Sequence, residues 1–374
     1  MIRLSKSCLS SEEKDAVLGV LDREFLGMGM EVQSFENGLA DFFDRPAVCV
    51  VNGTAALQLA LQAVGVGPGD EVLVPSLTYL ASFQAISATG AKAVACDVLA
   101  GSLTLDSNDA EKLITSRTKA IMPVHYAGGV TGIDALYKLA LKYGLRVIED
   151  AAHAFGTIHN GRKVGGFGDI VCFSFDGIKN ITSGEGGCVV TNDTVILEKI
   201  RDARLLGVEK DTDKRYSGQR SWQFDVSAQG WRYHMSNIMA AIGIVQLKRF
   251  PDFALARQKL ASLYDQLLVD ELNISALVQD YNYVVPHIYP IQILSKKPRK
   301  LIQDTMLEKG IQTGIHYQPN HQLSYYKSNR EFPVTDSVAQ RLLTLPLHPD
   351  VSEEDVRYIC ATLIDLVNGP PVAA

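Results

Sequence analysis

The sequence contains no apolar run that reaches the roughly 18 residues of a membrane-spanning helix. It also has no excess of positive charge, because its 36 basic and 42 acidic residues give a formal net charge of −6 at pH 7. Proteins that bind nucleic acids nonspecifically usually carry a basic surface. The opening residues, MIRLSKSCLSSEEKD, lack the apolar stretch of a signal peptide. We therefore expect a cytoplasmic protein that binds neither membranes nor nucleic acids.

Cysteine is scarce, and its positions are scattered without any C-x-x-C pair. Several of the six lie in apolar, strand-like runs such as AVCVV and DIVCFSF. Buried free thiols are therefore expected, rather than disulfides or a metal site.

Two signatures of nucleotide binding are missing as well. The sequence has no G-x-x-x-x-G-K-[ST] phosphate loop, and its glycine-rich segment VGVGPGD (64–70) follows a predicted helix and leads into a predicted strand. A dinucleotide fingerprint needs the opposite order, strand then glycines then helix. A nicotinamide-dependent oxidoreductase is therefore disfavoured.

From about residue 47, short β-rich runs alternate with helical segments. AVCVV (47–51), RVIED (146–150) and DIVCFSF (169–175) predict strands, whereas NGTAALQLALQAVG (52–65) and IDALYKLALKYG (133–144) predict helices. The strands show little polar alternation, which is typical of a mostly parallel sheet covered on both faces. The fold class is therefore α/β.

The pattern changes near residue 250. Residues 207–229 predict a long loop or hairpin. Farther along, one helix is expected before Pro251 and a second helix after it. We predict a large domain over residues 1–250, whose first 25 residues or so could pack elsewhere, and a smaller α/β domain over residues 251–374.

In parallel sheets, ligands bind at the carboxyl ends of the strands. Asp150 ends one predicted strand, and Lys179 follows another by four residues. An amine and a carboxylate in one cleft suit pyridoxal phosphate (PLP): the amine forms an imine with the aldehyde, and the carboxylate keeps the pyridine nitrogen protonated. A lone acid at a strand end can also be a simple helix cap.

The phosphate of such a cofactor could bind where NGTAALQLAL begins a helix. Backbone N–H groups of Gly53 and Thr54 would form an anion site there, and Ser174 could add a hydroxyl. Tyr79 follows a strand end and could stack on the pyridine ring. Thr54 as a helix cap and Tyr79 as an ordinary half-buried tyrosine are the structural alternatives.

Several motifs, in this order along the chain, resemble those of the DegT/DnrJ/EryC1/StrS aminotransferases, which act on nucleotide-linked keto sugars. They include FENGLADF (35–42), VNGTAALQLAL (51–61), VIEDAAHAFGT (147–157), FSFDGIKNITSGEGG (173–187) and GWRYHMSNIMAAIGIVQL (230–247). The resemblance covers nearly the whole chain. It implies a PLP-dependent enzyme of fold type I, like aspartate aminotransferase, that works as a homodimer with shared active sites.

The resemblance also implies roles for individual residues. Lys179 and Asp150 match the lysine that forms the imine and the acid that pairs with the pyridine nitrogen. His153 falls beside the ring hydroxyl, Tyr79 at the stacking position, and Gly53, Thr54 and Ser174 at the phosphate. The residues implied near the substrate are Glu185, His316, Tyr317 and His321. Two histidines without a further ligand do not indicate a metal site.

Two positions depart from the family pattern. Arg232 stands where the family often has an asparagine that reaches the cofactor phosphate of the partner subunit. Arginine can still bind a phosphate, so we expect that contact, with the diphosphate of the sugar nucleotide as the alternative. Asp176-Gly177 replaces bulkier pairs and is expected to shape the turn.

The expected reaction moves an amino group from L-glutamate to a nucleotide-linked keto-deoxysugar, with a 4-keto-6-deoxy sugar preferred. A PLP-dependent sugar dehydratase is one alternative, although such enzymes usually lack the lysine at this place. A non-enzymatic protein of the same fold is the other.

Overall fold

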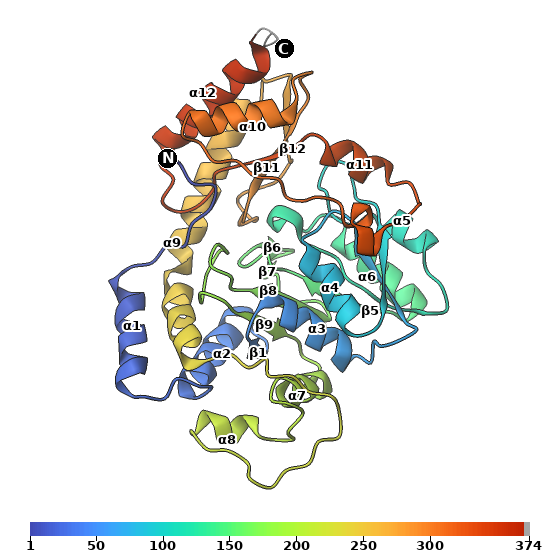
Figure 1. Cartoon of the computed structure of the whole chain (residues 1–374), viewed down its shortest axis with the longest axis vertical. Coiled ribbons are helices and arrows are strands. Elements are labelled where there is room, and N and C mark those ends of the chain that lie inside the picture. Colours follow the sequence, from blue (N-terminus) through green and yellow to red (C-terminus); the bar gives the residue numbers. More distant parts are fainter. Residues whose placement is uncertain (370–374) are drawn as a thin grey trace.

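The computed structural model describes residues 1–369, in which one long helix joins a large sheet to a small one (Figure 1). The large sheet has the strand order β1-β9-β8-β5-β4-β2-β3. Within it, β9 is the strand that runs antiparallel to its neighbours. The strands are β1 (Ala47–Val50), β2 (Glu71–Pro75), β3 (Lys92–Cys96), β4 (Thr118–Ile121), β5 (Arg146–Asp150), β8 (Ile170–Ser174) and β9 (Gly187–Val190). The predicted mostly parallel sheet is confirmed.

Apolar side chains leave this sheet on both faces, because successive residues of a strand point in opposite directions. In β1, Val48 and Val50 enter one core, whereas Ala47 and Cys49 enter the other. The first core packs mainly against α3 (Gly53–Ala63), α4 (Leu80–Ala88) and α7 (Thr194–Ala203), and the second against α2 (Met30–Phe43). Further helices are α5 (Ser107–Lys112), α6 (Ile133–Tyr143) and α8 (Thr212–Tyr216), and β6 (Ile158–His159) pairs with β7 (Arg162–Lys163).

The C-terminal part has its own core around an antiparallel sheet of β10 (Ile274–Ala276), β11 (Tyr289–Ile293) and β12 (Leu342–Leu345). The helices here are α10 (Arg299–Glu308), α11 (Pro333–Ala339) and α12 (Glu353–Asn368), of which α10 and α12 pack on this core. The C-terminal part thus contains the α/β elements expected there, and their division from the rest of the chain as a separate domain stays a prediction.

The expected break at Pro251 is absent, which corrects the prediction of two helices. One helix, α9 (Asn237–Leu268), runs through it. A proline inside a helix loses one hydrogen bond and costs about 3 kcal/mol or more. Packing offsets this cost, because Phe250 and Phe253 are buried in the large core and Leu260 in the small one. The proposed domain boundary near residue 250 thus lies within a helix.

The N-terminal residues cross to the small sheet, as Figure 1 shows. Ile2 forms a parallel bridge with Ile311, and the Leu347 amide donates to the carbonyl of Leu4 at 3.2 Å. Farther along, the Ser7 hydroxyl donates to the carbonyl of Gly177, and α1 (Ser11–Asp22) packs beside α9. The N-terminal segment thus contacts both the small sheet and the turn that carries Lys179.

Candidate active site

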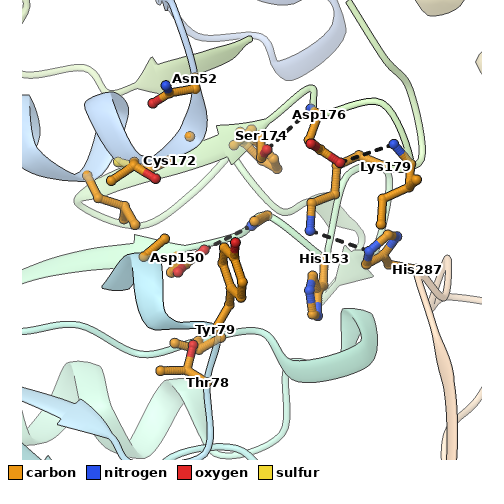
Figure 2. A pocket seen from close by; sticks show the side chains of 18 of the residues that line it. Asn52, Thr78, Tyr79, Asp150, His153, Cys172, Ser174, Asp176, Lys179 and His287 are labelled. Atoms are coloured by element: carbon orange, nitrogen blue, oxygen red, sulfur yellow. Dashed lines mark hydrogen bonds between the residues drawn. The ribbon is translucent and has the colours of Figure 1, made fainter. Parts of the chain in front are cut away.

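A cavity of about 430 Å³ opens at the carboxyl ends of β1, β2, β5 and β8. Its walls come from the segments that follow these strands and from two segments of the C-terminal part. Ten of the residues predicted for the site line it: Gly53, Thr54, Tyr79, Asp150, His153, Ser174, Lys179, Glu185, His316 and Tyr317. Figure 2 shows how several of them converge on one space. The strand-end rule therefore located the cavity correctly.

Lys179 lies on the turn after β8, where its side chain is partly buried. The turn is anchored by Asn180, whose amide nitrogen donates to the carbonyls of Phe155 and Val285, both at 3.2 Å. Burial lowers the pKa of Lys179 from 10.5 to about 8, although Asp150 and Asp176 act in the opposite direction. About a tenth of such amines are uncharged at pH 7. The amine can therefore act as a nucleophile near neutral pH.

Asp150 ends β5 and is buried, with both carboxylate oxygens held in place. The Ser82 hydroxyl donates to Oδ2 at 2.7 Å, and the Ala152 amide donates to Oδ1 at 3.2 Å. Thr78 in turn contacts the Ser82 hydroxyl at 3.0 Å. Within residues 1–369 no ion pair involves Asp150. It is a fixed carboxylate that can still pair with a cationic group in the cavity.

His153 is held in one tautomer. Its Nδ1 accepts a hydrogen bond from the Ala127 amide at 3.3 Å, so the proton of the neutral ring lies on Nε2. That nitrogen lies 2.9 Å from the Tyr317 hydroxyl and donates to it. Burial, together with Lys179 and His316, holds the pKa of His153 well below 6.5. The ring is therefore a neutral donor at physiological pH.

The turn between β1 and α3 fits an anion. Asn52 caps α3 by accepting from the Ala55 amide at 2.8 Å, so the earlier amides of Gly53 and Thr54 remain at the open end of the helix. A Cβ at Gly53 would lie only 2.8 Å from the Ser174 Cβ. Glycine here thus brings the helix N-terminus against the Ser174 hydroxyl. Because Asn52 is the cap, the alternative that Thr54 is the cap is not needed.

Three further residues lie at the cavity wall. Tyr79 is 61% exposed and its ring centroid is 5.6 Å from that of Tyr317. Glu185 is exposed, and partial burial and the nearby Asp176 raise its pKa from 4.5. His316 contacts the Thr344 hydroxyl at 2.9 Å, and burial lowers its pKa to about 4.

Two predicted residues are not brought to this cavity. His321 is buried elsewhere, between the Ser76 hydroxyl at 2.6 Å and the Asp336 carboxylate at 3.0 Å. Its ring stacks on Phe332, so it joins α11 to the segment after β2. Arg232 is exposed and does not line the cavity of its own chain.

Two residues that support the site could not be identified from the sequence. Ser82 positions Asp150, and His287 contacts Lys179, with 3.4 Å between Nε2 and Nζ. Both are ordinary residues in apolar segments, and no spacing pattern connects either of them to its partner. Only the folded chain brings them together.

The sequence profile of the DegT/DnrJ/EryC1/StrS aminotransferase family matches residues 7–364. The chain belongs to this family. Its activity is therefore that of a PLP-dependent sugar aminotransferase, and the family predicted from the motifs is confirmed. Among the described residues, no helix is long and apolar enough to cross a membrane, and no group of histidine, cysteine and acidic residues could hold a metal ion.

Relatives within the family match over nearly their full length. The spore coat polysaccharide biosynthesis protein SpsC of Bacillus subtilis is 36% identical over 96% of this chain and 96% of its own. Helicobacter pylori PseC, an aminotransferase involved in the biosynthesis of pseudoaminic acid, has a TM-score of 0.90 at 29% identity, over 98% of this chain and 99% of its own. A Streptococcus pneumoniae protein assigned as a sugar aminotransferase, in its PLP form, has a TM-score of 0.91 at 29% identity, over 98% of this chain and 98% of its own.

Proposed function

We propose that the chain transfers an amino group from L-glutamate to a nucleotide-linked keto-deoxysugar, with a 4-keto-6-deoxy sugar as the preferred acceptor. The observation that carries the proposal is Lys179, an amine in the cavity with its pKa lowered to about 8 and without a carboxylate partner in residues 1–369. SpsC and PseC support a sugar acceptor, because their names place them in polysaccharide and pseudoaminic acid biosynthesis.

The residues of the cavity fit PLP. Gly53, Thr54 and Ser174 would hold the phosphate at the helix N-terminus, since the missing Cβ of Gly53 brings the helix and the hydroxyl together. Asp150, a buried carboxylate without an ion-pair partner in the described residues, would face the pyridine nitrogen. When bound, the cofactor supplies an electron sink that stabilises the charge left on carbon after a proton is removed.

The proton transfers then fall to Lys179. Its Nζ would hold the cofactor at rest, and it would become free to move protons once the amine of the donor has taken its place. The released Nζ takes the proton from the α-carbon of the donor, and in the second half of the reaction it delivers a proton to the sugar carbon that gains nitrogen. Asp150 would hold the protonated pyridine nitrogen in place, because the Ser82 hydroxyl and the Ala152 amide fix both carboxylate oxygens. The neutral His153 donates a hydrogen bond to the Tyr317 hydroxyl and so fixes the orientation of that hydroxyl in the cavity.

We further propose a homodimer in which Arg232 contacts the cofactor phosphate bound by the partner subunit. Its exposed position outside its own cavity agrees with a role across an interface. Glu185, His316 and Tyr317 line the cavity and are the residues we assign to substrate binding. The cytoplasmic location stays a prediction.

Borohydride reduction of the PLP-loaded protein followed by peptide mapping tests the tether. The label is expected on Lys179 and should be lost in Lys179→Met but kept in Lys138→Met, a change of an exposed lysine on α6. A panel of nucleotide keto sugars with glutamate then reads the acceptor from the mass of the product and the position of its amine. A label on another lysine, or turnover of 3-keto sugars alone, would contradict the respective part of the proposal.

A further inference from the structure

His287 lies beside the amine of Lys179, in the segment before β11 (Figure 2). The imidazole is buried, and its Nε2 is 3.4 Å from Lys179 Nζ. Within residues 1–369 this is the one side-chain hydrogen-bond contact of Lys179 Nζ. The ring of His153 lies 4.6 Å away, centroid to centroid, at an angle of 49°. The amine thus contacts one imidazole, beside which a second one lies, and within residues 1–369 it has no carboxylate at ion-pair distance.

The backbone of His287 is fixed by Arg257, a buried residue of α9. One guanidinium nitrogen, Nη1, donates to the carbonyls of His287 and Leu347, both at 3.1 Å. None of the ion pairs in the described residues includes Arg257. The guanidinium therefore holds two loops of the C-terminal part against the helix, and it sets where the imidazole of His287 lies.

The hydrogen bonding of the imidazole does not account for its presence at this buried position. Its Nδ1 is buried and has no hydrogen-bond partner within the described residues. A buried polar atom without a partner is unfavourable, and an apolar side chain of similar size would avoid that cost. Within residues 1–369, the one polar contact that the side chain makes is with the amine of Lys179, which indicates that its role concerns that amine.

The surroundings keep His287 neutral. The charged or titratable groups that act on His287 are Lys179, together with His153, His316 and Arg257. The carboxylates of Asp150 and Asp176 act on Lys179. Burial lowers the pKa of His287 well below 6.5, and the nearby Lys179 acts in the same direction. A neutral ring can accept a hydrogen bond at Nε2 when Nδ1 carries the proton.

We infer that His287 is the acceptor that holds Lys179 Nζ in place whenever this nitrogen is free, so that the released amine stays where it takes and returns the substrate proton. This inference rests on the role proposed above for Lys179. His287 is therefore a positioning residue, and Arg257 supports it by fixing its backbone. The acceptor matters while the lysine is detached, so its loss should affect turnover more than the binding of substrates.

Two substitutions separate this role from a structural one. His287→Leu removes the acceptor, whereas His287→Gln keeps a neutral one. We expect His287→Leu to slow kcat and the glutamate half-reaction about 10- to 100-fold, because hydrogen bonds to charged groups contribute on this scale, with KM for glutamate changed less than about threefold. His287→Gln should recover most of the rate. His159→Leu, a change on the β6–β7 hairpin outside the cavity, is the matched control.

The apoprotein supplies readouts that do not depend on turnover. The melting temperature of His287→Leu should equal or exceed that of the wild type. PLP attachment to Lys179 needs the neutral amine, so its rate, trapped with borohydride, should rise through a midpoint near pH 8 in the wild type and at a lower pH in His287→Leu.

Wild-type rates in both variants, or equal losses of rate, melting temperature and PLP content, would overturn the inference. A borohydride label on a lysine other than Lys179 would instead refute the proposed function.

Discussion

Replacing Lys179 with methionine should stabilise the apoprotein near neutral pH. Its pKa in the folded chain is about 8, against an ordinary value of 10.5, so folding disfavours the charged form. Each pKa unit corresponds to 1.36 kcal/mol, which gives at most about 3.4 kcal/mol. Because the side chain is only partly buried, the cavity admits water and we expect about 2 kcal/mol. Methionine has a similar length and carries no charge.

The pH dependence follows from linkage. Below pH 8 the lysine is protonated in both states, so the full penalty is present and the variant has its greatest advantage. Between pH 8 and 10.5 the unfolded chain binds more protons than the folded one, so the stability contributed by Lys179 rises with pH. The advantage of the variant should therefore shrink over this window and disappear above it.

Urea unfolding of the two apoproteins at pH 7 and at pH 9.5 measures the effect. With a slope of about 3 kcal/mol per molar urea, the variant midpoint at pH 7 should be higher by roughly 0.5–1 M. Lys138→Met, on the surface of α6, should not shift the midpoint at either pH. The reasoning is refuted if Lys179→Met is no more stable than the wild type at pH 7, or if its advantage is equal at both values.

Three further substitutions test the other parts of the site. Gly53→Ala would place a Cβ 2.8 Å from that of Ser174, and this overpacking of about 1–3 kcal/mol should weaken PLP affinity roughly 10-fold or more in an absorbance titration. Ser82→Ala frees one oxygen of Asp150, so kcat should fall about 10-fold while PLP still attaches to Lys179; an unchanged kcat would argue against this positioning role. Arg232→Ala should lower PLP affinity about 10- to 100-fold and leave the sugar KM unaltered, whereas the reverse pattern would assign the arginine to the sugar diphosphate.

Much of the fold and the centre of the site could be predicted because both depend on local patterns. The apolar runs determine the strands, and a parallel sheet brings the ends of β5 and β8 to one edge, which places Asp150 and Lys179 in one cavity. Gly53 was predictable for the same reason, since it begins the helix that follows β1.

The residues that could not be predicted depend on contacts between distant segments. His287 is 108 positions from Lys179, and Ser82 is 68 positions from Asp150. The break expected at Pro251 was wrong because the packing of the flanking turns of α9 outweighs a local preference. His321 was assigned to the substrate from its motif, whereas both its ring nitrogens already have partners elsewhere.

The continuity of α9 limits how the enzyme can open and close. A helix of 32 residues that is packed into both cores leaves no slack connection on which the small sheet could swing. Any movement of that sheet over the cavity mouth has to flex the helix itself, and the turn before Pro251, where one backbone hydrogen bond is missing, resists bending least. Arg257 lies beyond this turn and holds the backbone of His287, so the same flexing would carry the imidazole toward or away from the lysine.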